Sequence, residues 1–256
     1  MSERVTAVAA IAPMLIEPDV RTTQVSQLLR GHEAEQIAKQ GLWLHVRSGD
    51  EYEGWIHQGY VASVPNSNPL IRGWDDARPL SLGCTVRDPS GATRKLPLGA
   101  LITGGEQRTA GLAMTLEERR QSFSPTGDAI TASAQTFFEG TSYEWGGVTP
   151  WGADCSGLVQ SSFALHGVHL PRDAWLQAQT GTELSMDFST LASGDLLFFS
   201  DEPNARVSHV AISLGGSRVV HQALGRGGHA VDDLESAEEY TTLLRGRFRC
   251  ARRVLS

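Results

Sequence analysis

The chain has 256 residues, of which 40% are hydrophobic and 20% are charged, and its formal net charge is −7. This is the composition of a globular protein with one large domain or two to three small ones. Basic residues are too few to indicate a nucleic-acid-binding protein, and the apolar runs are too short to cross a membrane.

The N-terminus has a weak apolar patch at Val5–Leu15, but Glu3 precedes it, Pro13 interrupts it and no basic segment leads into it. This pattern argues against a secretory signal. The number of cysteines is odd, so at least one is unpaired, as is typical of proteins from a reducing compartment. We therefore expect a cytoplasmic protein. The three cysteines are Cys84, Cys155 and Cys250.

The first half of the chain consists of short apolar runs separated by Gly, Pro, Asn and Asp. This texture predicts small β barrels and not helices. The sequence PNSNP at 65–69 predicts a linker, which gives one barrel over 5–64 and a possible second, divergent barrel over 70–120. The polar segment Met114–Gly127 predicts a second junction.

The third predicted domain, residues 126–256, begins with helices and continues with strands. Asp128–Glu139 has helical composition, with Gly140 as a stop, and Cys155–His166 predicts a second helix that ends at Gly167. This order predicts an α+β fold in which helices pack on a mostly antiparallel sheet. The predicted strands are Asp195–Ser200, Val207–Leu214, Arg218–Ala223 and Arg247–Leu255.

Cys155 follows a Gly- and Pro-rich loop and lies at the start of a predicted helix, where Asp154 and Ser156 can cap the first turn. Unpaired N–H groups and the helix dipole favour a thiolate there and can stabilise an oxyanion formed when the sulfur attacks a carbonyl. The alternative is a small buried cysteine, which is the usual role of a lone Cys.

Two histidines could serve this cysteine. His209 and His221 lie on neighbouring predicted strands joined by a Gly-Gly-Ser turn at 215–217. One can take the thiol proton while the other fixes the tautomer of the first, in a Cys-His-His version of the nucleophile, base and orienter. Alternatives are a structural histidine or a zinc site; since close ligand pairs and a fourth ligand are missing, we expect no metal and no cofactor.

These motifs resemble the NlpC-type cell-wall cysteine peptidases, which have a papain-like fold, over about Thr126–Leu255. They occur in the family's order and at similar spacing. The matching segments are YEWGG (143–147), DCSGLVQ (154–160), LPRDA (170–174), GDLLFF (194–199), SHVAISLG (208–215) and VVHQA (219–223).

The resemblance implies that Cys155 is the nucleophile, His209 the base and His221 the orienting residue. It also implies that the hydroxyl of Tyr143 assists the oxyanion site. By the same resemblance, substrate-cleft positions are Asp154, Ser156, Arg172 and Asp173.

The N-terminal half is similar to the bacterial SH3-like barrels often fused to such peptidases, through Trp43, Glu51–Ile56 and Thr23–Glu35. In γ-D-glutamyl-L-diamino acid endopeptidases of this architecture, the first barrel closes one end of the cleft and selects a free N-terminal L-Ala. The resemblance implies recycling of murein peptides by cleavage after γ-linked D-Glu. Candidates for receiving the substrate's ammonium are Tyr52, Glu53 and Glu17, with core packing or solvation as the alternative.

Two other functions remain open at this point. The same cysteine site could perform acyl transfer or hydrolyse another amide. A non-catalytic protein that binds wall peptides through its barrels is a further alternative, although it has no chemical need for a complete Cys-His-His set.

Overall fold

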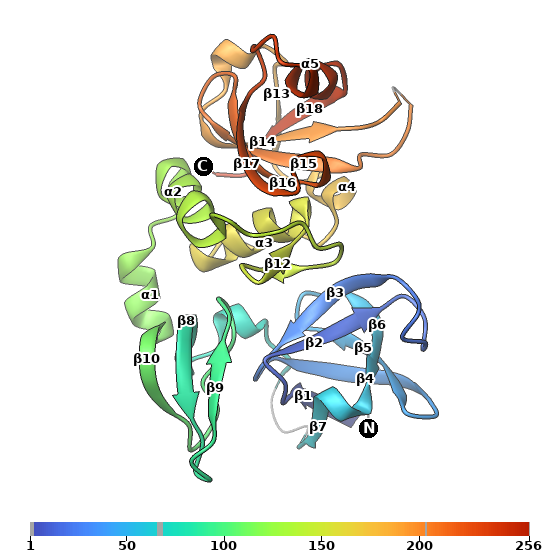
Figure 1. The fold of residues 1–256 in the computed structure, drawn as a ribbon, viewed down its shortest axis with the longest axis vertical. Helices are drawn as coiled ribbons and strands as arrows, with labels where there is room; N and C mark the ends of the chain where they lie inside the picture. Colours follow the sequence, from blue (N-terminus) through green and yellow to red (C-terminus); the bar gives the residue numbers. More distant parts are fainter. Residues whose placement is uncertain (1–2, 66–68, 203, 256) are drawn as a thin grey trace. The chain divides into compact units, whose positions relative to one another are not determined.

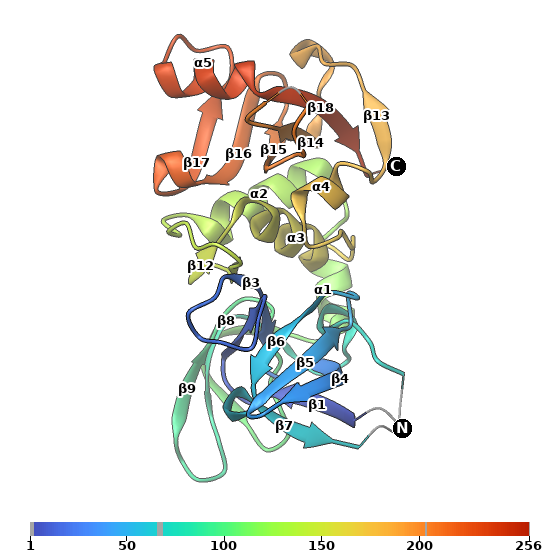
Figure 2. The same ribbon diagram turned by 90° about the vertical axis from the view of Figure 1, so that its right-hand side faces the viewer.

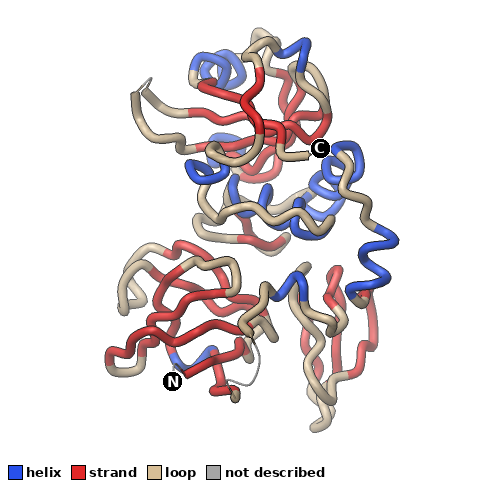
Figure 3. The backbone as a smooth tube through the Cα atoms, turned by 180° about the vertical axis from the view of Figure 1, so that it is seen from behind, coloured by secondary structure: helices blue, strands red, loops and turns tan. Residues whose placement is uncertain are grey.

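The computed structural model describes residues 3–65, 69–202 and 204–255, and the chain divides into two compact units. The first comprises Met1–Ser122 with Trp145–Gly147, and the second comprises Phe123–Glu144 with Val148–Ser256. Strands and loops make up most of the first unit, whereas most helices belong to the second (Figure 3). The predicted linker at 65–69 falls mostly outside the described residues.

The main sheet of the first unit is antiparallel and contains, among the described residues, seven strands in the order β3-β2-β6-β5-β4-β1-β7. Alternate residues of β5 are buried, as expected for a sheet with one face on a core. The strands are β1 (Glu3–Ala7), β2 (Ile11–Leu15), β3 (Gln24–Leu29), β4 (Glu33–Gln40), β5 (Trp43–Ser48), β6 (Glu53–His57) and β7 (Val61–Val64).

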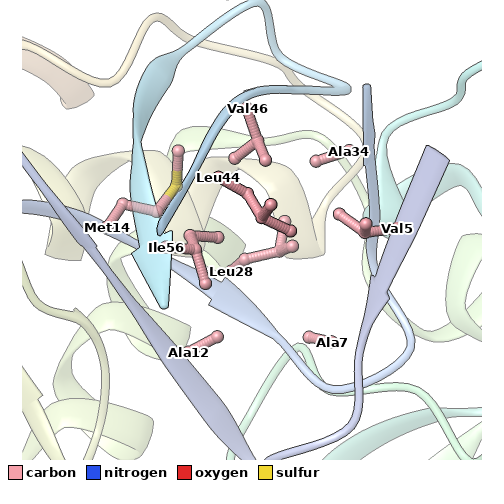
Figure 4. Packing of buried hydrophobic residues seen from close by; sticks show 9 residues of the cluster. All are labelled: Val5, Ala7, Ala12, Met14, Leu28, Ala34, Leu44, Val46 and Ile56. Atoms are coloured by element: carbon pink, nitrogen blue, oxygen red, sulfur yellow. The ribbon is translucent and has the colours of Figure 1, made fainter. Parts of the chain in front are cut away.

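The core of this sheet is hydrophobic (Figure 4). Its side chains come from six of the strands, which the sequence spaces by turns. Because each strand contributes only one or two of them, none of the strands could bury its apolar side alone. The buried cluster is Val5, Ala7, Ala12, Met14, Leu28, Ala34, Leu44, Val46 and Ile56.

A smaller sheet in the same unit joins three described strands in the order β10-β8-β9: β8 (Leu80–Arg87), β9 (Thr93–Leu96) and β10 (Gln107–Met114). It is tied to the first sheet, because Leu101 N–H donates to the Arg30 carbonyl at 2.9 Å and Arg30 forms an ion pair with Glu106 at 2.7 Å. Helix α1 (Leu116–Ser122) occupies part of the predicted polar junction, and its Arg119 donates to the Trp74 carbonyl.

The second unit is α+β, as predicted, and its described strands form a six-stranded antiparallel sheet in the order β13-β18-β14-β15-β16-β17. The bounds of all four predicted strands lie within two residues of observed strands; the second of them begins two residues later than predicted, at His209. The strands are β13 (Thr182–Leu184), β14 (Ser193–Phe199), β15 (His209–Leu214), β16 (Arg218–Ala223), β17 (Gly228–Asp233) and β18 (Phe248–Arg253), beside the short pair β11 (Val148–Thr149) and β12 (Gly152–Ala153).

Helices cover both faces of this sheet. Figures 1 and 2 show α2 (Gly127–Phe138) and α3 (Cys155–Leu165) on one side of β14 to β17, and α5 (Glu239–Gly246) on the other. The α5 side is a hydrophobic cluster. A shorter helix, α4, spans Ala174–Gln177. The cluster contains Leu191, Leu197, Phe199, Ala211, Val219, Leu234, Leu244, Phe248 and Ala251.

Both predicted helices of this unit form, with bounds one residue shorter at the C-terminus. Helix α2 is followed by Gly140 at φ 72°, and α3 by Gly167 at φ 77°, a backbone conformation that glycine adopts without steric cost. Nearly every residue of α3 is buried, which is typical of a helix packed on all sides. None of the described helices is long and apolar enough to cross a membrane.

Candidate active site

Helix α3 places Cys155 at its first turn, next to the capping residue Asp154. The Asp154 Oδ1 atom accepts the Gly157 N–H at 2.7 Å, which satisfies one of the free donors at the helix start. Cys155 is 5% exposed, and the backbone N–H groups of Val210 and Ser156 act on its thiol in the direction that lowers its pKa. Since Val210 follows His209 directly, the cysteine lies beside the start of β15 although 54 positions separate the two residues in sequence.

The protonation state of Cys155 differs from the expectation drawn from its place on a helix. Burial, together with the charge of Asp154, raises the pKa of the Cys155 thiol to about 12, while the N–H groups of Val210 and Ser156 oppose the shift. Desolvation of the sulfur therefore outweighs the helix start. In the free protein the sulfur is a thiol at neutral pH, and its attack on a carbonyl requires a base.

His209 and His221 meet across β15 and β16. Ile212 pairs with Val220, and the same register puts His221 opposite Ala211, diagonal to His209 on the same face. The His209 Nε2 and His221 Nδ1 atoms lie 2.9 Å apart. Burial and the neighbouring His221 lower the pKa of His209 well below its usual range, so that its ring is neutral and able to accept a proton.

Sequence reasoning missed Asp232, which extends this pair. Its Oδ2 atom lies 2.9 Å from His221 Nε2, and both side chains are buried. Although burial acts in the opposite direction, hydrogen bonds from His221 and Arg226 lower the pKa of Asp232 to about 2. The carboxylate is therefore ionised at neutral pH.

The signal that could have revealed Asp232 is weak. It lies on β17, a strand absent from the sequence prediction, in which Val220 pairs with Val231 and His221 with Ala230. The segment GHAVDD (228–233) contains only two apolar side chains, Ala230 and Val231, so its strand pattern is weak, and the strand lies at the edge of the sheet. The pairing of this edge with β16 brings the carboxylate to His221.

Tyr143 is half-buried, and the charges of the site affect the pKa of its hydroxyl. Burial raises the pKa of its hydroxyl, and Cys155 and Asp154 act in the same direction. The hydroxyl thus keeps its proton and can donate a hydrogen bond. The Tyr143 N–H donates to the Gly227 carbonyl at 3.0 Å, which fixes the loop that carries it. Its assistance to an oxyanion stays a prediction.

The predicted cleft residues Asp154, Ser156 and Arg172 form a buried network. Arg172 donates to Asp154 Oδ2 at 2.6 Å, to Asp154 Oδ1 at 3.0 Å and to Ser156 Oγ at 2.8 Å. This bidentate pair braces the first turn of α3, on which Cys155 lies. Asp173 is half-buried and accepts the Trp175 Nε1–H at 3.1 Å. Substrate contact by these four residues stays a prediction.

The three candidates of the N-terminal half belong to the first unit. The Glu53 carboxylate accepts from Arg47 at 2.7 Å, Tyr52 packs against the hydrophobic cluster of Figure 4, and Glu17 is exposed. Their contact with a substrate ammonium stays a prediction. In the part of the chain that the structure describes, no group of three or more His, Cys, Asp and Glu side chains is arranged to hold a metal ion.

Comparisons with known proteins find relatives of this chain. Residues 140–247 match the sequence model of the NlpC/P60 family. The chain is 41% identical over 86 residues to a γ-D-glutamyl-L-lysine dipeptidyl-peptidase of Bacillus subtilis (strain 168), covering 33% of this chain and 28% of that protein. It is 27% identical over 245 residues to dipeptidyl-peptidase 6 of Lysinibacillus sphaericus, covering 85% and 87%.

A solved structure extends the likeness of the fold to nearly the whole chain. The crystal structure of an NlpC/P60 family protein from Bacillus cereus ATCC 10987 covers 99% of this chain and 100% of its own, with a TM-score of 0.76 at 16% identity. The family match over residues 140–247 includes the cysteine and both histidines. The likeness to the crystal structure extends to the helix and sheet on which these residues lie. Residues 140–247, which include Cys155, His209 and His221, therefore belong to the NlpC/P60 family.

Proposed function

We propose that the protein hydrolyses the bond between γ-D-glutamate and the diamino acid of murein peptides that carry a free N-terminal L-Ala. The observation that carries the proposal is the His209–His221 pair, whose ring nitrogens lie 2.9 Å apart, at the start of a strand whose Val210 N–H acts on the pKa of the Cys155 thiol. This arrangement supplies a nucleophile, a neutral base and an orienting residue in one place.

The reaction follows from these protonation states. As the Cys155 sulfur attacks the carbonyl carbon, its proton passes to His209, and the oxyanion forms near the N–H groups at the start of α3. The C–N bond then breaks, and His209 returns the proton to the leaving amine. Water, deprotonated by His209, attacks the thioester and releases the γ-D-glutamyl product, after which the sulfur regains its proton.

The substrate class rests on the relatives. The Bacillus subtilis protein is named for γ-D-glutamyl-L-lysine peptides, but the match covers 28% of its length, so the substrate is part of this proposal. A role in recycling small wall peptides in the cytoplasm belongs to the same proposal. It is tested by fractionating cells and assaying the cleavage in each fraction, and activity confined to the exterior would contradict it.

The direct test uses mass spectrometry of digests of L-Ala-γ-D-Glu-L-Lys and of its N-acetylated form. We expect the free-amine peptide to yield L-Ala-γ-D-Glu and lysine, and the acetylated peptide to remain intact. Cys155→Ala should abolish the cleavage, whereas Cys250→Ala, which removes a free cysteine from β18, should retain it. Undiminished turnover by Cys155→Ala would exclude this mechanism.

A further inference from the structure

A carboxylate stands at the end of the histidine pair, opposite the cysteine. His209 contacts His221 through Nε2 and Nδ1, and His221 contacts Asp232 through Nε2 and Oδ2, each at 2.9 Å. His221 is 0% exposed and Asp232 is 7% exposed. Three side chains from β15, β16 and β17 thus form a continuous series of hydrogen bonds, in which His221 and Asp232 are buried and His209 is partly buried.

The donors and acceptors in this series are determined by its last member. An ionised carboxylate only accepts hydrogen bonds, so a His221 ring with a single proton carries that proton on Nε2, which faces Asp232 Oδ2 at 2.9 Å. The His221 Nδ1 atom then has a lone pair, and the shared hydrogen bond must come from His209 Nε2–H. The remaining nitrogen of His209, Nδ1, is left without a proton.

Arg226 keeps Asp232 in the accepting state. Its Nη2 and Nε atoms donate to Asp232 Oδ1 at 2.7 Å and Oδ2 at 3.2 Å. The same guanidinium binds Glu238 at 2.6 and 2.7 Å and lies 4.4 Å from the Tyr240 ring centre. Asp232 therefore holds its charge without taking the proton of His221.

We propose that Asp232 is a positioning residue, which sets the tautomers of His221 and His209 and thereby leaves His209 Nδ1 free to receive the thiol proton of Cys155. The inference rests on the proposed nucleophile and base. It predicts that the carboxylate acts on the chemical step through two imidazole rings, without contacting the substrate.

The decisive variant is Asp232→Asn. The amide oxygen is expected at the Oδ1 site, where the Arg226 contact is shorter, so that the NH₂ group faces His221 Nε2. Both histidines must then take the opposite tautomer, and His209 Nδ1 carries a proton. We expect kcat to fall by about 10²- to 10⁴-fold with KM unchanged, as when an orienting carboxylate is replaced by its amide.

Asp195→Asn is the matched control. Asp195 is 2% exposed and is held by the fork of Arg253 at 2.8 and 2.6 Å, but it lies on β14 and none of its hydrogen-bond partners in the structure is a histidine. This variant shows how much kcat changes when a buried carboxylate–arginine pair is weakened and no histidine changes its tautomer. We expect kcat within about twofold of wild type for this control.

Two further readouts separate positioning from a purely structural role. Asp232→Ala removes the hydrogen-bond acceptor of His221 Nε2 without placing a donor there, so neither tautomer is imposed. Its kcat should therefore lie between those of wild type and Asp232→Asn. Nitrogen-15 NMR of the imidazoles should show His209 Nδ1 unprotonated in wild type and protonated in Asp232→Asn.

Equal kcat losses in the Asp232→Asn and Asp195→Asn variants, or an unchanged His209 tautomer, would overturn the inference while leaving the proposed reaction intact. Full activity of Cys155→Ala would instead overturn the proposed function itself. The two failures are therefore distinguishable with the same set of proteins.

Discussion

The two units differ in where their polar side chains lie relative to the hydrophobic clusters. In the first, the cluster of Figure 4 is hydrophobic, the ion pairs Arg47–Glu53 and Arg21–Asp19 lie at the surface, and the more buried pair Arg30–Glu106 lies outside that cluster. In the second, a hydrophobic cluster shares one face of the sheet with the buried His221 and Asp232. Burying polar groups is costly unless they are hydrogen-bonded, and in the second unit they are bonded in a series that ends beside the cysteine.

This difference teaches that the first unit is stabilised mainly by excluding water from apolar side chains, whereas the second also uses burial to set chemistry. Desolvation raises the pKa of the Cys155 thiol and lowers that of His209. Both groups are thus neutral in the free protein, and in the proposed reaction the proton moves between them when the sulfur attacks a carbonyl.

The strongest test of the comparison replaces one partly buried histidine in each unit. His209→Ala should lower kcat by about 10³-fold or more, because it removes the base. His32 is partly buried in the first unit, where its Nε2 contacts the Gly99 carbonyl at 2.8 Å. Its alanine variant should lose stability but keep kcat, as measured by steady-state kinetics beside thermal unfolding. A similar loss of kcat in both variants would contradict the division of roles.

Core truncation should affect the two units about equally. Ile56 and Leu197 are 0% exposed, one in each hydrophobic cluster. Each alanine variant should lower the free energy of unfolding by about 2–5 kcal/mol through lost burial and the cavity left behind. Denaturant titration measures this, with the exposed Leu243→Ala as control. A loss confined to the second unit would mean that the first contributes little to stability.

A buried and an exposed carboxylate should differ in their contribution to stability. Asp195→Asn weakens a pair whose carboxylate is 2% exposed, and should cost about 1–3 kcal/mol of unfolding free energy. Asp19→Asn breaks the exposed pair with Arg21 and should leave stability unchanged, because solvent screens that interaction. Titrations at low and high salt should give the same ranking; equal effects of both variants would contradict it.

The smallest expected effect is in the acidic part of the pH profile. Because the pKa of His209 is lowered well below 6.5, the base stays unprotonated until the pH falls below that range. The value of kcat/KM should therefore not decline as the pH falls from about 7 to about 6.5, and it should decline only at lower pH. A profile of kcat/KM against pH, corrected for stability, measures this. An acidic limb centred above 6.5 would mean that His209 is not desolvated.

The sequence contained enough to predict the helix that carries Cys155 and the strands that carry the two histidines. Asp154 caps the helix, Gly167 ends it, and the glycine pair at 215–216 marks the turn between β15 and β16. These are local properties, readable from neighbouring residues. The family resemblance added the roles, and the comparisons place residues 140–247 in the family but leave those roles as proposals.

The tertiary structure alone decided which groups meet and in which protonation state. Nothing local to Asp232 indicates a histidine partner, because the contact depends on the pairing of β17 with β16. Likewise, the start of a helix suggested a thiolate at Cys155, but packing of α3 against the sheet removed the sulfur from water and reversed that expectation. Helix capping and the alternation of apolar and polar residues depend on a few neighbouring residues, so the sequence shows them directly. Burial and cross-strand contact are properties of the assembled fold, so only the structure could show that Cys155 begins as a thiol awaiting a base.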